Sequence, residues 1–118
     1  KVGCKYSQEH RYEEGYYDCS SLVQRLYQEV GISLPAIAST QGEFMVTHGL
    51  EVTEGELEPG DLIFYSYEQN GQFRNISHVA IYVGNGRMVH AANSRRGVVN
   101  DPFNPSNIGL YGRPSRLQ

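Results

Sequence analysis

The sequence has few cysteines, no surplus of basic residues and no long apolar run, and each absence excludes a class of protein. Two cysteines, Cys4 and Cys19, are too few for a disulfide framework or a four-cysteine zinc site. The 10 Lys and Arg residues are outnumbered by 13 Asp and Glu, which gives a net charge of −3. A non-specific nucleic-acid binder needs a basic excess, and a membrane-spanning helix needs roughly 18 apolar residues in a row. We therefore expect neither a nucleic-acid partner nor a membrane span.

The composition is that of one folded domain. The chain has 118 residues, of which 39% are hydrophobic and 19% are charged, and this balance is typical of globular rather than disordered proteins. A chain of this length hides roughly two-thirds of its unfolded surface on folding. We predict a single domain over residues 1–118, and a monomer. Because the chain begins at Lys1 and shows no signal-peptide pattern, we expect it to be excised from a longer protein.

An amphipathic helix is predicted in the first quarter of the chain. Apolar side chains recur there at the spacing of one helix face, at Leu22, Val23, Leu26, Tyr27 and Val30. Asp18 is a typical N-cap residue and Gly31 a typical helix stop, so the helix is expected over residues 19–30. A second, short helix is predicted over residues 40–46.

The second half of the chain has the pattern of β-strands. Strands are predicted over residues 61–65, 78–83 and 87–91, with a short strand at 98–99. Residues 101–114, which are rich in Pro and Asn, are expected to be mostly loop. A helix followed by strands, without βαβ alternation, predicts an α+β fold with an antiparallel sheet.

Cys19 is the first candidate for chemistry. It lies in the predicted first helical turn, where unpaired N–H groups and the positive end of the helix dipole favour a thiolate. A thiolate is the nucleophile of cysteine hydrolases. The alternative is an ordinary buried cysteine, and the charge of neighbouring Asp18 opposes ionisation. Cys4 lacks this helical context, and two separate thiols are expected rather than a disulfide between them.

His78 and His90 are the candidate partners of this cysteine, and their relative placement depends on the turn between their strands. If the turn consists of residues 85–86 alone, the two side chains point to opposite faces of the hairpin. If it consists of residues 84–86, His90 lies opposite Ala80 and the two histidines are diagonal neighbours on one face. A glycine at the third position suits the left-handed residue of such a three-residue turn.

Histidines on one face would complete a nucleophile, base and orienting group. His78 would take the proton from Cys19, and His90 would orient His78. Two alternatives stay open at this point. The histidines could have unrelated roles, or the three side chains could bind zinc. We rank zinc lowest because the sequence shows no closely spaced ligand pair.

Four motifs follow one another along the chain: DCSSLV at 18–23, PGDLIF at 59–64, HVAIYVGNG at 78–86 and MVHA at 88–91. Together they resemble the NlpC-type family of bacterial cell-wall cysteine peptidases, over about residues 3–99. The resemblance implies a papain-like fold, in which the nucleophile helix packs on an antiparallel β-sheet. It also implies that no metal or other cofactor is needed.

The resemblance assigns a role to individual residues. Cys19 would be the nucleophile, His78 the base and His90 the orienting third member. The hydroxyl of Tyr6 would join the Cys19 backbone N–H in the oxyanion hole. Positions that bind substrate in relatives are matched by Asp18, Ser20 and Ser77.

The same resemblance implies an endopeptidase that cuts peptidoglycan stem peptides, most often between γ-D-glutamate and meso-diaminopimelate or lysine. It would act outside the cell, in the cell wall or periplasm, and other domains of the parent protein would target it. Two alternative functions are kept. One is an amidase of the cysteine–histidine type that cuts the sugar–peptide link. The other is a non-catalytic cell-wall-binding module, against which the set of Cys19, His78 and His90 argues.

Overall fold

A computed structural model describes residues 5–6, 16–17, 19–67, 69, 71–93 and 97–117. Their central feature is a six-stranded antiparallel sheet in the order β3-β8-β4-β5-β6-β7. The strands are β3 (Glu51–Val52), β4 (Leu62–Tyr65), β5 (His78–Gly84), β6 (Arg87–Asn93), β7 (Gly97–Pro102) and β8 (Ile108–Gly112). A separate parallel pair is formed by β1 (Lys5–Tyr6) and β2 (Tyr16–Tyr17).

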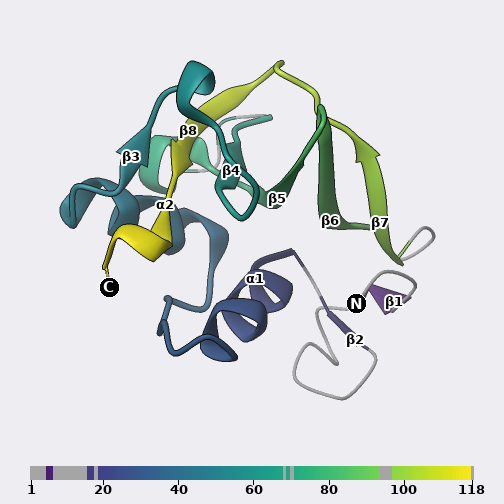
Figure 1. Ribbon diagram of the computed structural model, residues 1–118, viewed down its shortest axis with the longest axis horizontal. Helices are drawn as coiled ribbons and strands as arrows, with labels where there is room; N and C mark the ends of the chain where they lie inside the picture. The colour runs from purple at the N-terminus through teal and green to yellow at the C-terminus, as the bar shows by residue number, and fades with distance from the viewer. Residues whose placement is uncertain are drawn as a thin grey trace.

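Two α-helices accompany the sheet, α1 (Cys19–Gln28) and α2 (Ala38–Thr47). Figure 1 shows α1 below the sheet, with β2 near the start of the helix, and α1 contacts β5 and β6. The combination of two helices with an antiparallel sheet confirms the predicted α+β, papain-like architecture. Within the described part of the chain, no helix is long and apolar enough to cross a bilayer.

The first helix begins at the predicted residue and ends two residues early. The chain leaves the helix through hydrogen bonds from the N–H groups of Val30 and Ile32 to the Tyr27 carbonyl oxygen, at 3.0 and 2.9 Å. Gly31 sits between them with φ 86°. This left-handed conformation favours glycine, as the sequence predicted for the helix stop.

The prediction that residues 101–114 are mostly loop was wrong. Asp101 and Pro102 complete β7, and β8 is a central strand between β3 and β4. Two glycines make β8 hard to recognise in the sequence, and both lie close to side chains from other segments. A Cβ atom on Gly112 would overlap the side chain of Met45 from α2, and one on Gly109 would lie 3.0 Å from Ile76.

The sheet is buried on both faces, which explains the uninterrupted apolar run of β4. One face packs against the helices, in a cluster that includes Cys19, Leu22, Val23, Leu62, Phe64, Val79, Ile81, Ala91, Val98 and Leu110. The opposite face carries a smaller cluster of Val52, Ile63, Tyr65, Ala80, Met88 and Tyr111. The helix that begins with Cys19 is thus fixed to the strands that carry the histidines.

Asp61, at the start of β4, holds a turn in place. Its side chain is 2% exposed, and its carboxylate accepts a hydrogen bond from the Glu58 N–H at 2.9 Å. Arg113, just beyond β8, donates two further hydrogen bonds to it, at 2.8 and 2.9 Å. This carboxylate therefore stabilises the connection that leads into β4 and ties it to the end of β8.

Candidate active site

The hairpin of β5 and β6 brings the two histidines to the same face by a route that neither predicted turn anticipated. Gly84 pairs with Arg87, so the turn has only the two residues Asn85 and Gly86, with φ 54° and 70°. A bulge between Tyr82 and Gly84 then shifts the register by one residue, so that Tyr82 pairs with Met88. The turn is therefore the two-residue turn of the first alternative. The strand register beyond the bulge is the one expected for the three-residue turn of residues 84–86.

His78 and His90 are in direct contact as a result. The Nε2 atom of His78 lies 2.8 Å from Nδ1 of His90, and the rings meet edge to face with their centroids 5.0 Å apart. The two imidazoles therefore share one face, which is one of the two arrangements that the sequence left open. Burial, and then the proximity of His90, lowers the pKa of His78 to about 4. A histidine with this pKa is neutral at physiological pH and can accept a proton.

Cys19 is the first residue of α1, as the sequence predicted, and it forms no disulfide. Its side chain is 8% exposed and belongs to the same buried cluster as Val79, the residue that directly follows His78. The backbone of the next residue is held from α2, because the Gln41 side-chain amide donates a hydrogen bond to the Ser20 carbonyl oxygen at 3.0 Å. The start of the helix is therefore held in place on two sides.

Two tyrosines lie beside His78: Tyr65 at the end of β4 and Tyr67 two residues later. The rings of Tyr65 and Tyr67 stack at 5.5 Å and lie 6.0 and 6.2 Å from the His78 ring. Tyr65 is fully buried, whereas Tyr67 is 52% exposed. Burial raises the pKa of Tyr67, and the nearby charge of Cys19 raises it further. Tyr67 thus lies within electrostatic range of the sulfur and beside the His78 ring, at the surface of the site.

Asp101 is a member of this cluster that the sequence analysis missed. Its Oδ2 atom lies 2.9 Å from Nε2 of His90, and the side chains of His90 and Asp101 are only 10% and 20% exposed. It was placed in an expected loop, but it lies on β7 opposite Met88 of β6. The one available signal was the short strand predicted at residues 98–99, which in the structure continues to Pro102.

The structure describes only some of the residues predicted to bind the oxyanion or the substrate. Asp18 and the side chain of Tyr6 lie outside the described residues, although the backbone of Tyr6 is part of β1. The side chain of Ser20 is buried. Ser77 is exposed directly before His78, and its N–H donates to the Tyr65 carbonyl oxygen at 3.0 Å. The proposed contacts of these four residues with substrate stay predictions.

The geometry does not favour the zinc alternative. Among the side chains that the structure describes, no three His, Cys, Asp or Glu groups are gathered as metal ligands. Nε2 of His78 and Nδ1 of His90 face each other at hydrogen-bond distance, and Nε2 of His90 faces a carboxylate. These three nitrogens are thus arranged for proton sharing along a chain of hydrogen bonds.

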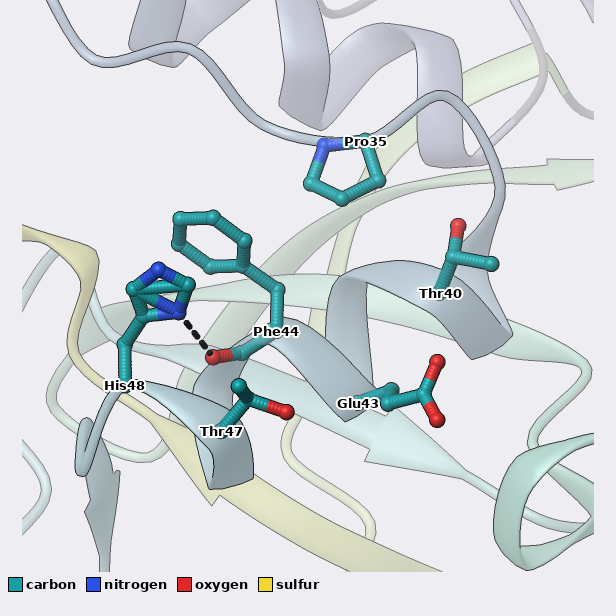
Figure 2. A pocket seen from close by; sticks show the side chains of 6 residues that line it. All are labelled: Pro35, Thr40, Glu43, Phe44, Thr47 and His48. Atoms are coloured by element: carbon teal, nitrogen blue, oxygen red, sulfur yellow. Dashed lines mark hydrogen bonds between the residues drawn. The ribbon is translucent and has the colours of Figure 1, made fainter.

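A separate groove lies on α2 and contains none of these residues. Figure 2 shows its lining, which consists of Pro35, Thr40, Glu43, Phe44, Thr47 and His48. The rings of Phe44 and His48 stack there at 4.0 Å, and the exposed His48 ring lies 3.3 Å from the Phe44 carbonyl oxygen through Nδ1. This histidine caps the end of its own helix.

The chain matches the model of the NlpC/P60 family over residues 4–108. It is 33% identical over 101 residues to a γ-D-glutamyl-L-lysine dipeptidyl-peptidase from Bacillus cereus, a match that covers 85% of this chain and 28% of that protein. The chain thus spans less than a third of the length of this curated relative.

Solved structures show the same fold. NlpC1 from Trichomonas vaginalis superposes with a TM-score of 0.82 at 29% identity, over 97% of this chain and 40% of that one. RipD from Mycobacterium tuberculosis, described as a non-catalytic NlpC/p60 domain protein adapted to peptidoglycan binding, superposes with a TM-score of 0.66 at 26% identity. That match covers 82% of this chain and 66% of RipD.

Proposed function

Because the chain belongs to the NlpC/P60 family, we propose that it is a cysteine peptidase that hydrolyses an amide bond in the stem peptides of peptidoglycan. Cys19 is the nucleophile, His78 the general base and acid, and His90 the group that orients His78. We further propose that these residues form one catalytic domain of a longer protein, acting outside the cell in the cell wall or periplasm.

The contact between His78 and His90 is the observation that carries this proposal. It occupies Nε2 of His78 and leaves Nδ1 as the nitrogen that can serve the sulfur. A pKa of about 4 keeps His78 unprotonated at neutral pH, which a general base requires. Cys19 lies at the N-terminal end of α1, where the helix dipole stabilises negative charge on sulfur.

On this proposal, the reaction has an acylation stage and a hydrolysis stage. His78 takes the thiol proton as the Cys19 sulfur attacks the scissile carbonyl carbon and forms a tetrahedral intermediate. The backbone N–H of Cys19, together with the Tyr6 hydroxyl, stabilises the negative charge that develops on the oxygen. His78 then gives its proton to the leaving amine as the C–N bond breaks. Water, activated by the same imidazole, releases the acyl group from sulfur.

The substrate is proposed from the relatives. The Bacillus cereus protein is named for the bond between γ-D-glutamate and L-lysine, and we propose the bond between γ-D-glutamate and the diamino acid for this chain. On this proposal, Asp18, Ser20 and Ser77 contact the stem peptide. No metal or other cofactor takes part in these steps.

A binding module without activity is the second candidate, and RipD gives it a specific basis. The two candidates differ in what they require of the side chains. A binding module does not need two imidazoles in hydrogen-bond contact, whereas a hydrolase needs each ring nitrogen in a defined protonation state. The arrangement of His78 and His90 favours the hydrolase.

Digestion of defined muropeptides, followed by mass spectrometry, tests the proposal. We expect two fragments that divide the stem peptide after γ-D-glutamate, and no products from the Cys19→Ala variant. Release of an intact stem peptide from the sugar would identify the amidase instead. Binding to cell walls without any cleavage by the wild-type chain would identify the binding module.

A further inference from the structure

The two histidines are part of a longer chain of hydrogen bonds that ends in a carboxylate. His78 contacts His90 at 2.8 Å, and His90 contacts Asp101 at 2.9 Å through its other ring nitrogen. The three side chains come from three neighbouring strands, β5, β6 and β7. Each contact therefore crosses one strand boundary, and the pairing of the sheet fixes the spacing of all three groups.

The strand register explains why Asp101 reaches His90. His90 pairs with Val99 on β7, and Asp101 lies two residues further on, opposite Met88. Residues two positions apart share a face of a strand, so Asp101 is a diagonal neighbour of His90. His78 and His90 have the same diagonal relationship one strand earlier, since Tyr82 pairs with Met88.

A carboxylate at this end determines where the protons lie. An ionised carboxylate can only accept hydrogen bonds, so Nε2 of His90 must carry the hydrogen. In a neutral ring the lone pair of His90 is then on Nδ1, which can only accept. Nε2 of His78 must therefore be the donor, and the lone pair of His78 is left on Nδ1. That is the one arrangement in which His78 can take a proton from a thiol.

Without the carboxylate, the opposite arrangement would be equally available. His90 could carry its hydrogen on Nδ1 and donate to His78, which would place the hydrogen of His78 on the nitrogen that must receive the thiol proton. An imidazole in this tautomer cannot act as the base. The contact between the histidines alone does not choose between the two directions, because each ring can donate or accept.

We propose that Asp101 is a positioning residue that sets the tautomers of both histidines and so keeps His78 ready to deprotonate Cys19. The catalytic consequence rests on the proposed function, whereas the tautomer assignment stands on the geometry of the three side chains. Asp101 acts through His90 and does not touch the substrate.

The tautomers can be measured without any reaction. In the Cys19→Ala background, ¹⁵N chemical shifts of the imidazole nitrogens report which nitrogen of each ring carries the hydrogen. We expect the hydrogen on Nε2 in both His78 and His90. With Asp101→Ala added, we expect a mixture of tautomers at both rings. Tautomers that stay unchanged in this variant would overturn the proposal.

Kinetics provide the second measurement, with Asp101→Asn and Asp101→Ala compared on the same muropeptide. We expect kcat to fall roughly 100-fold for Asp101→Ala with KM nearly unchanged. The fall should be at least as large for Asp101→Asn, because its amide NH2 group can donate to Nε2 of His90 and so favour the opposite tautomer. Glu43→Gln is the matched control for charge, since Glu43 is exposed on α2, and it should leave kcat unchanged. Equal kcat for the wild type and both Asp101 variants would also overturn the proposal.

The two measurements separate this proposal from the proposed function. If the wild-type chain cleaves no muropeptide, the peptidase assignment fails, while the ¹⁵N shifts still decide whether Asp101 sets the tautomers. Should Asp101→Ala fail to fold, Asp101→Asn, which has the same shape, replaces it in both measurements. A shift in the tautomer populations of this variant supports the proposal, and identical populations and kcat contradict it.

Discussion

Nε2 of His78 lies 2.8 Å from Nδ1 of His90, and this contact exists because the hairpin between them contains one bulged residue. A two-residue turn followed by regular pairing would have placed the two rings on opposite faces. The extra residue on β5 shifts the register by one, so that both rings lie on the same face although the turn has only two residues. The contact between two proposed catalytic groups thus depends on an irregularity several residues away from either of them.

The first prediction concerns the three proposed catalytic side chains. Cys19→Ala and His78→Ala should each lower kcat by roughly 10⁴-fold or more, because they remove the nucleophile or its base. His90→Ala should cost less, since an orienting group is partly replaced by water. Hydrolysis of muropeptides by variants with unchanged unfolding midpoints measures this order. A Cys19→Ser variant with full activity would contradict the thiolate mechanism.

The second prediction separates thiol chemistry from metal chemistry. We expect that a chelator such as EDTA leaves hydrolysis intact and that a thiol alkylating reagent abolishes it. The physical reason is that, in the proposed mechanism, the Cys19 sulfur forms the acyl bond. Three of the histidine nitrogens form hydrogen bonds with one another and with Asp101. Loss of activity with EDTA, restored by added Zn²⁺, would favour the zinc alternative.

The third prediction is a pH dependence of stability that originates in His78. Its pKa falls from 6.5 in the unfolded chain to about 4 in the folded protein. Between these values the unfolded state binds more protons, so stability increases with pH. The stabilisation is complete above pH 6.5 and is lost as the pH falls toward 4, by about 3 kcal/mol.

Urea unfolding of the wild type and of His78→Gln at a series of pH values measures this effect. The difference between their free energies of unfolding should change by about 3 kcal/mol across the window, to the disadvantage of the wild type at acid pH. Contributions from Asp and Glu are common to both proteins and cancel. A difference that does not vary with pH would mean that the pKa of His78 is not lowered.

The fourth prediction tests why β8 contains glycine. Gly112→Ala should destabilise the protein by about 1–3 kcal/mol, because the added Cβ would overlap the buried side chain of Met45. Gly55→Ala is the matched control, since nothing lies within 4 Å of a Cβ at that position, and it should change stability by less than about 0.5 kcal/mol. Equal unfolding midpoints for the two variants would show that the contact with Met45 is not limiting.

The sequence predicted those elements whose pattern is local. The spacing of apolar residues after Asp18 placed the start of α1 at Cys19, and alternation from His78 onward placed β5 and β6. These signals depend only on neighbouring residues and on which face they bury. Local patterns of this kind are therefore sufficient to identify the candidate nucleophile and the two histidines.

The parts that the sequence did not predict depend on contacts between distant segments. Gly109 and Gly112 are typical of loops in a sequence. Their place in a strand is explained by the side chains of Ile76 and Met45, which pack close to them. Asp101 lies two residues after a short β-branched pair and directly before a proline. Its place on a strand could therefore be recognised only from the pairing with β6. The bulge in the hairpin was equally hidden, because Asn85 and Gly86 are compatible with turns of either length.

Among the strands that the structure describes, β7 is the outermost of its sheet and pairs with β6. Asp101 thus lies on an edge strand, whereas His78 and His90 lie on the inner strands β5 and β6. Backbone ladders at a margin open more often than those at the centre. In the proposed role of Asp101, brief opening of this sheet edge would break its contact with His90 and leave the core intact. Turnover is therefore expected to decline under mild denaturant before the protein as a whole unfolds.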